Sequence, residues 1–128
     1  MNRTLVSEAA PAAIGPYSTA IDTQQSSQTV YVSGQLPIDP LTGEFAGQDI
    51  KLQTQQSLQN LQAILKEADM DLSNVVKTTV LLADIADFSD MNEVYGHFFS
   101  QPYPARSAFQ VAALPKNARV EIEAIAVR

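Results

Sequence analysis

The sequence predicts an α+β fold in which two helices pack on one face of a mixed sheet of about six strands. Two stretches repeat their apolar residues at intervals of three and four, which is typical of amphipathic helices. Short β-branched or alternating runs stand before, between and after these stretches, as strands do. The order strands, helix, strand, helix, strands favours a sheet with helical connections.

The composition narrows the functional class. With 128 residues the chain is long enough for a core of its own, and we expect residues 1–128 to form a single domain. It has no cysteine and one histidine, so no metal site is expected. A net charge of −6 argues against a nucleic-acid or anionic-membrane partner, because phosphate binding needs clustered Lys and Arg. No apolar run approaches membrane length, which favours a cytoplasmic protein.

The first third of the chain is rich in turns. Residues 4–7 are predicted to form a short edge strand, and the prolines and glycine of 9–18 exclude a helix there. The Gly15-Pro16 turn fixes the position of Tyr17, which could therefore serve a site. More often, such a tyrosine only packs its ring against the protein and leaves its hydroxyl at the surface. Strands are predicted at 18–22 and 29–33.

The strand predicted at 29–33 leads into Ser33-Gly34-Gln35. This sequence puts a hydroxyl group and a backbone without a side chain at a strand end, where polar groups of ligands are often bound. Taken alone, the motif is a weak signal.

The middle of the chain contains both helices. Leu58, Leu61 and Leu65 place the first helix within 49–68, and residues 75–82 form a strand that is apolar on both faces and therefore buried on both. Asp84 or Asp87 caps the second helix. The apolar stripe of this helix consists of Phe88, Met91, Tyr95 and Phe98, while Asn92 and His97 lie among polar neighbours.

Residues 104–127 read as a β-hairpin, because two alternating runs flank a loop that contains Pro and Asn. In this interpretation Arg106 shares one face with Glu121 and Glu123, within a rung or two. An exposed ion pair at a sheet edge is the plainer explanation, and such pairs contribute about 0–1 kcal/mol. The alternative is a binding site on rigid strands.

Two helices can cover only one face of the predicted sheet. The other face would carry Ile125, Val127 and apolar residues of 75–82 beside the two glutamates. A bare apolar face promotes aggregation, so self-association is expected. Arg106 and the glutamates would then lie at or near an interface between subunits.

Five segments in this order resemble the RidA family (YjgF-type reactive intermediate deaminases). They are APAAIGPYS at 10–18, VSGQLP at 32–37, NVVKTTV at 74–80, PARS at 104–107 and VEIEAIA at 120–126. The resemblance covers nearly the whole chain. It implies a chorismate-mutase-like fold, a homotrimer with clefts between subunits, and hydrolysis of 2-imino acids or their enamine tautomers to 2-oxo acids and ammonia.

The resemblance also implies roles for particular residues. Arg106 matches the residue that binds the substrate carboxylate, and Glu121 the acid that holds or activates water. Tyr17, Ser33, Gly34, Asn92 and Ala108 match positions that line the cleft. A guanidinium binds a planar carboxylate at two points, and a positioned carboxylate can accept a proton from water. Since an imine carbon is already electrophilic, no cofactor is expected.

Two positions depart from the family pattern. Ala108 stands where many relatives have cysteine; if that position acts through its backbone carbonyl, hydrolysis survives. Asp69 stands where relatives often end the first helix with glycine, which concerns packing only.

Two other functions remain compatible with the sequence. A trimer that binds small carboxylates as a regulator, with little turnover, would use the same Arg106 cleft. A nucleic-acid or chaperone role, which has been attached to members of the family, fits the acidic balance and the single histidine less well.

Overall fold

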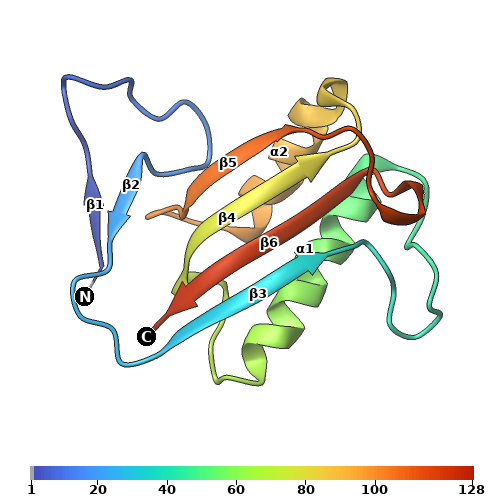
Figure 1. Ribbon diagram of the computed structural model, residues 1–128, viewed down its shortest axis with the longest axis horizontal. Helices are drawn as coiled ribbons and strands as arrows, with labels where there is room; N and C mark the ends of the chain where they lie inside the picture. Colours follow the sequence, from blue (N-terminus) through green and yellow to red (C-terminus); the bar gives the residue numbers. More distant parts are fainter. Residues whose placement is uncertain (1) are drawn as a thin grey trace.

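The computed structural model describes residues 2–128 (Figure 1). Its strands are β1 (Arg3–Leu5), β2 (Ala20–Asp22), β3 (Thr29–Gln35), β4 (Val75–Leu82), β5 (Ala105–Gln110) and β6 (Val120–Val127). Its helices are α1 (Ile50–Lys66) and α2 (Phe88–Phe98), and short 3₁₀ turns occupy Leu72–Asn74, Ile85–Asp87 and Pro115–Asn117. The α+β class with two helices is confirmed.

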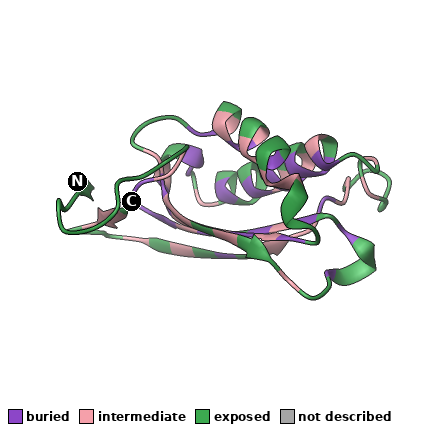
Figure 2. Ribbon diagram, turned by 90° about the horizontal axis from the view of Figure 1, so that it is seen from above, coloured by how far each residue is buried: buried purple, intermediate pink, exposed green. Residues whose placement is uncertain are grey.

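The strands form two sheets instead of the single sheet of about six that the sequence predicts. Four of them pair in the order β3-β6-β4-β5, while β1 pairs only with β2. Six polar residues, 23–28, follow the three-residue strand β2 and form a loop. Strand β2 therefore ends without pairing with a strand of the larger sheet. Both helices lie on one face of the larger sheet, as predicted, and within residues 2–128 no helix covers the other face (Figure 2).

Helix α1 begins where its sequence allows capping. The Asp49 carboxylate accepts hydrogen bonds from the backbone N–H groups of Lys51 and Leu52, at 3.1 and 3.2 Å. Leu58, Leu61 and Leu65 are completely buried against the sheet. Asp69 ends the segment with φ of 55°, so it adopts the left-handed conformation that usually selects glycine.

Strand β4 is central in the larger sheet, and the sequence predicts its range correctly. Thr78, Val80 and Leu82 are completely buried beneath the helices. Lys77, Thr79 and Leu81 point to the open face and stay half-buried. The two helices and β3, β6 and β4 enclose one hydrophobic core.

Helix α2 packs Met91 and Tyr95 into this core, and neither side chain has exposed surface. Of the two predicted caps, Asp84 caps the preceding 3₁₀ turn by accepting from the backbone N–H of Ala86 at 2.9 Å. Asp87 is the residue before α2, but its carboxylate pairs with Arg119 at 3.3 Å instead of capping the helix.

The predicted hairpin of 104–127 is wrong. Both alternating runs are strands, but β4 lies between them: β5 pairs with β4 in parallel and β6 pairs with β4 antiparallel. The period of two shows which residues share a face of one strand, but it does not identify the neighbouring strand. Because β4 is apolar on both faces, it is best buried between two neighbours, and helix α2 supplies the connection that a parallel partner needs.

The open face of the larger sheet is partly apolar. Tyr31 of β3 and Phe109 of β5 are 77% and 46% exposed, and Leu81 and Ile125 are half-buried beside them. Val127 already lies buried within the chain, at 7% exposure. Among the helices of residues 2–128, none is long and apolar enough to cross a membrane.

Candidate functional site

Arg106 lies in a cluster of aromatic rings between β5 and α2. Its Nη1 donates a hydrogen bond of 2.7 Å to Oδ1 of Asn92. Its guanidinium carbon is 4.8 Å from the ring centre of Tyr95, 5.5 Å from that of Tyr17 and 5.6 Å from that of Phe88. These distances are within the range of attraction between a cation and an aromatic face. The guanidinium is therefore held on several sides.

The sequence predicts three members of this cluster, namely Arg106, Tyr17 and Asn92, and the structure brings them together. The sequence analysis assigns Phe88 and Tyr95 only to the apolar stripe of α2. Their spacing from Asn92, at i, i+4 and i+7, places all three on one helical face, and this spacing is the signal that could have found them.

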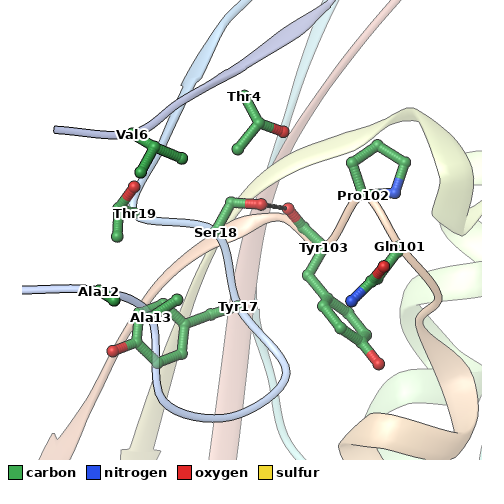
Figure 3. A pocket seen from close by; sticks show the side chains of 10 residues that line it. All are labelled: Thr4, Val6, Ala12, Ala13, Tyr17, Ser18, Thr19, Gln101, Pro102 and Tyr103. Atoms are coloured by element: carbon green, nitrogen blue, oxygen red, sulfur yellow. Dashed lines mark hydrogen bonds between the residues drawn. The ribbon is translucent and has the colours of Figure 1, made fainter. Parts of the chain in front are cut away.

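Tyr17 reaches Arg106 because the N-terminal segment folds back onto β5. Gly15 has φ of +117°, a conformation that favours glycine, and it turns the chain beside Asn92. The backbone N–H of Ser18 then donates to the Pro104 carbonyl at 2.9 Å. The Ser18 hydroxyl donates to the Tyr103 carbonyl (Figure 3). Two bonds thus fix the residue next to Tyr17.

Arg106 keeps an unmatched charge. Burial lowers the pKa of its guanidinium, while Tyr95 and Tyr17 oppose the change. Arginine nevertheless stays charged at neutral pH. The ion pairs within residues 2–128 join other residues, so no Asp or Glu of this part of the chain neutralises Arg106. A half-buried, uncompensated guanidinium is suited to an anionic ligand.

Glu121 lies in a second cluster, at β3. A Cβ atom on Gly34 would lie 2.1 Å from Oε2 of Glu121, so the missing side chain at position 34 is what makes room for this carboxylate. Ser33, next to Gly34, is exposed on β3. Glu121 is half-buried whereas Glu123, two residues further on, is exposed. The structure thus places Gly34 against Glu121, with Ser33 next to Gly34 in the strand.

The prediction that Arg106 shares a face with Glu121 and Glu123 is wrong. Thr78 of β4 stands opposite Arg106 on one side and opposite Ala124 on the other. Residues opposite one another share a face, so Arg106 is on the helix face with Ala124, and the glutamates are on the open face. From strand spacing and rise, the Arg106 and Glu121 backbones are roughly 14 Å apart. The two clusters cannot serve one ligand within one chain.

The remaining predicted residue, Ala108, is on β5 two residues beyond Arg106, so it shares the helix face. It packs against the core as a partly buried side chain. Residues 2–128 contain no group of three or more His, Cys, Asp or Glu placed to hold a metal ion.

A cavity of about 530 Å³ lies beside Tyr17, between the N-terminal segment and the connection from α2 to β5 (Figure 3). Its walls come from the N-terminal segment and from Gln101, Pro102 and Tyr103. Tyr17 is the only predicted site residue among the lining residues. The sequence analysis does not predict this cavity, because it forms only where the N-terminal segment and residues 101–103, distant in sequence, come together.

Comparison with known proteins identifies a family for the chain. The family model described as Endoribonuclease L-PSP matches residues 7–128. The 2-iminobutanoate/2-iminopropanoate deaminase of Bos taurus is 54% identical over 127 residues, which cover 98% of this chain and 90% of that protein. A RutC family protein, y4sK of Sinorhizobium fredii, is 58% identical over 116 residues, covering 91% of this chain and 90% of that one.

Solved structures of similar proteins support the same family. RidA of the Antarctic bacterium Psychrobacter sp. has a TM-score of 0.77 and 46% identity, covering 98% of this chain and 99% of its own. TdcF of E. coli, solved with bound serine, has a TM-score of 0.75 and 43% identity, covering 98% of each chain. The resemblance to the RidA family is confirmed, and the chain belongs to the family described as Endoribonuclease L-PSP.

Proposed function

We propose that the protein hydrolyses 2-imino acids, or their enamine tautomers, to 2-oxo acids and ammonia, in clefts that form between copies of the chain. The observation that carries this proposal is the uncompensated guanidinium of Arg106, fixed by Asn92 and by aromatic rings. Relatives about half identical over nearly the whole chain are named 2-iminobutanoate/2-iminopropanoate deaminase, which supports this substrate class.

Arg106 would bind the substrate carboxylate. Asn92 occupies Nη1, which leaves the other N–H groups of the guanidinium for a ligand. Two parallel hydrogen bonds from such a fork orient a planar carboxylate as well as attract it. The imine carbon next to that carboxylate is then held in a fixed place.

Glu121 would activate the water that attacks this carbon. As the water oxygen adds to the C=N bond, the carboxylate accepts a proton and passes it to the nitrogen. The carboxylate then transfers the hydroxyl proton of the resulting carbinolamine to the nitrogen in the same way, and the C–N bond breaks. The products are the 2-oxo acid and ammonia, with both water protons on the nitrogen.

These two roles need two copies of the chain, because Arg106 and Glu121 lie on opposite faces of one sheet. The partly apolar open face, with Tyr31 and Phe109 exposed, supports self-association. Either a two-fold dimer or a closed ring can bring the Arg106 cluster of one copy to the Glu121 cluster of the next. The resemblance to the RidA family favours three copies.

A coupled assay tests the proposal. An amino-acid oxidase or a PLP-dependent dehydratase supplies imines with side chains of different size, and release of the 2-oxo acid is followed with and without the protein. We expect faster release in its presence. A protein that binds 2-oxo acids but leaves the release rate unchanged would instead be the carboxylate-binding regulator.

A further inference from the structure

Tyr95 lies directly behind the guanidinium of Arg106. Of the three rings around this group, that of Tyr95 is nearest, with its centre 4.8 Å from the guanidinium carbon. Tyr95 has no exposed surface, whereas Tyr17 and Phe88 are half-buried. A ligand on Arg106 therefore cannot touch Tyr95, and any effect of Tyr95 on the ligand must act through the arginine.

The Tyr95 ring is itself held from the sheet and from its own helix. Its hydroxyl shares a hydrogen bond of 2.7 Å with the Thr78 hydroxyl. Thr78 stands opposite Arg106 in the parallel pairing of β4 with β5, so the residue that anchors the ring is the strand neighbour of the residue that the ring supports. Phe99, which directly follows α2, packs against the Tyr95 ring with ring centres 4.5 Å apart.

Tyr95 is a neutral phenol at neutral pH. Burial raises the pKa of its hydroxyl to about 12, against the opposing effects of the Thr78 hydrogen bond and the Arg106 charge. The contact with Arg106 is therefore one between a cation and an uncharged ring, which is strongest when both are removed from water.

We propose that Tyr95, anchored by Thr78, is a positioning residue that holds the Arg106 guanidinium in the plane needed to receive a carboxylate. The inference rests on the proposed function only for the identity of the ligand. An arginine that is already held loses less freedom when it binds. This gain is made equally for substrate and transition state, so losing it raises KM and leaves kcat nearly unchanged.

The test compares three variants. Tyr95→Leu removes the ring, and we expect KM for the imine and Kd for 2-oxobutanoate to rise roughly 3- to 30-fold. Tyr95→Phe keeps the ring and should rescue both values to within about 3-fold of the unchanged protein. Leu65→Ala is the control: it truncates a completely buried side chain near the end of α1, which is not one of the residues that hold Arg106 or Tyr95, so stability should fall while Kd stays constant.

Thr78→Val provides an independent test if Tyr95→Leu does not fold. It leaves the buried phenol without its partner, so we expect Kd to rise, and the double variant Thr78→Val with Tyr95→Phe should restore it. Equal Kd values in Tyr95→Leu and Leu65→Ala, or a Thr78→Val variant that loses stability without any change in Kd, would overturn the inference.

The NMR signal of the Arg106 Nε–H group separates failure of this inference from failure of the proposed function. The ring current of Tyr95 should shift this signal in the unchanged protein and in Tyr95→Phe, but not in Tyr95→Leu. A protein that binds 2-oxobutanoate without hydrolysing imines would contradict the proposed function alone. A signal at the same position in all three proteins would contradict the role of Tyr95.

Discussion

Arg106 and Glu121 project from opposite faces of the same four-stranded sheet. Thr78 is the strand neighbour of Arg106, and Leu81 is that of Glu121, so strand β4 separates the two functional side chains. Each lies in a well-defined cluster, one with aromatic rings and Asn92 and the other with Gly34. A reaction that needs both residues must therefore join two copies of the chain.

Arg106→Lys should reduce imine hydrolysis by roughly 10- to 100-fold, since lysine keeps the charge but loses the fork and the flat contact with the rings. Circular dichroism should stay unchanged, because Arg106 makes no ion pair within residues 2–128. Hydrolysis close to that of the unchanged protein would show that the carboxylate is bound elsewhere.

Glu121→Gln should lower turnover by about 10²–10⁴-fold, as loss of a positioned general base does. Binding of 2-oxo acids should persist, because the amide keeps the shape and removes a negative charge. Glu123→Gln is the matched control: Glu123 is on the same face of β6 but is exposed and not beside Gly34, so turnover should hardly change. If Glu123→Gln is the more damaging change, the catalytic acid has been assigned to the wrong glutamate.

Gly34→Ala should lower turnover by about 10²-fold without unfolding the protein, because the added Cβ would lie 2.1 Å from Oε2 of Glu121 and must displace it. Gly96→Ala is the control, since its Cβ would lie no closer than 3.9 Å to Pro16 and alanine favours the helix by about 1 kcal/mol. Steady-state kinetics and thermal unfolding measure both. Equal activity of the two variants would mean that the position of Glu121 does not matter.

Ile125→Asp should dissociate the assembly, because it would bury a charged side chain on the open face, where even an ion pair with Lys77, its neighbour on β4, does not offset the loss of water. Ile125 is the cleaner target than Val127, which is already buried within one chain. Light scattering should change from a particle of about three times 13.9 kDa to the single chain, with loss of activity.

Leu52→Asp is the control for this change. Leu52 is 48% exposed on α1, away from the open face, so assembly should persist. An Ile125→Asp variant that keeps its assembly would show that the open face is not an interface. A monomeric, fully active variant would show that the site does not need two copies.

The sequence predicts individual elements better than their pairing. Residues 75–82 form the predicted strand, but burial on both faces is not found within one chain: Lys77, Thr79 and Leu81 on the open face are only half-buried. The alternation in 104–127 correctly separates Arg106 and Ala108 from Phe109, and Glu121 from Ile122. Insertion of β4 between these strands depends on contacts distant in sequence, which a period of two does not encode.

In the candidate site, too, the sequence predicts individual residues better than the contacts between them. Short motifs mark Arg106 and Tyr17 as candidates, the family resemblance adds Asn92, and the fold brings the three together. The support from Tyr95 depends on the register of Thr78 with Arg106, and such register is set by the tertiary packing of two strands and a helix. Motifs therefore identify the residues that face a ligand more readily than those that act from behind them.

Mixing two inactive variants tests the shared site most directly. Arg106→Lys and Glu121→Gln are unfolded together, refolded as a mixture and assayed for imine hydrolysis. If each site takes Arg106 from one copy and Glu121 from another, an equal mixture should recover about a quarter of the activity of the unchanged protein. A mixture that is no more active than its two components would contradict the shared site.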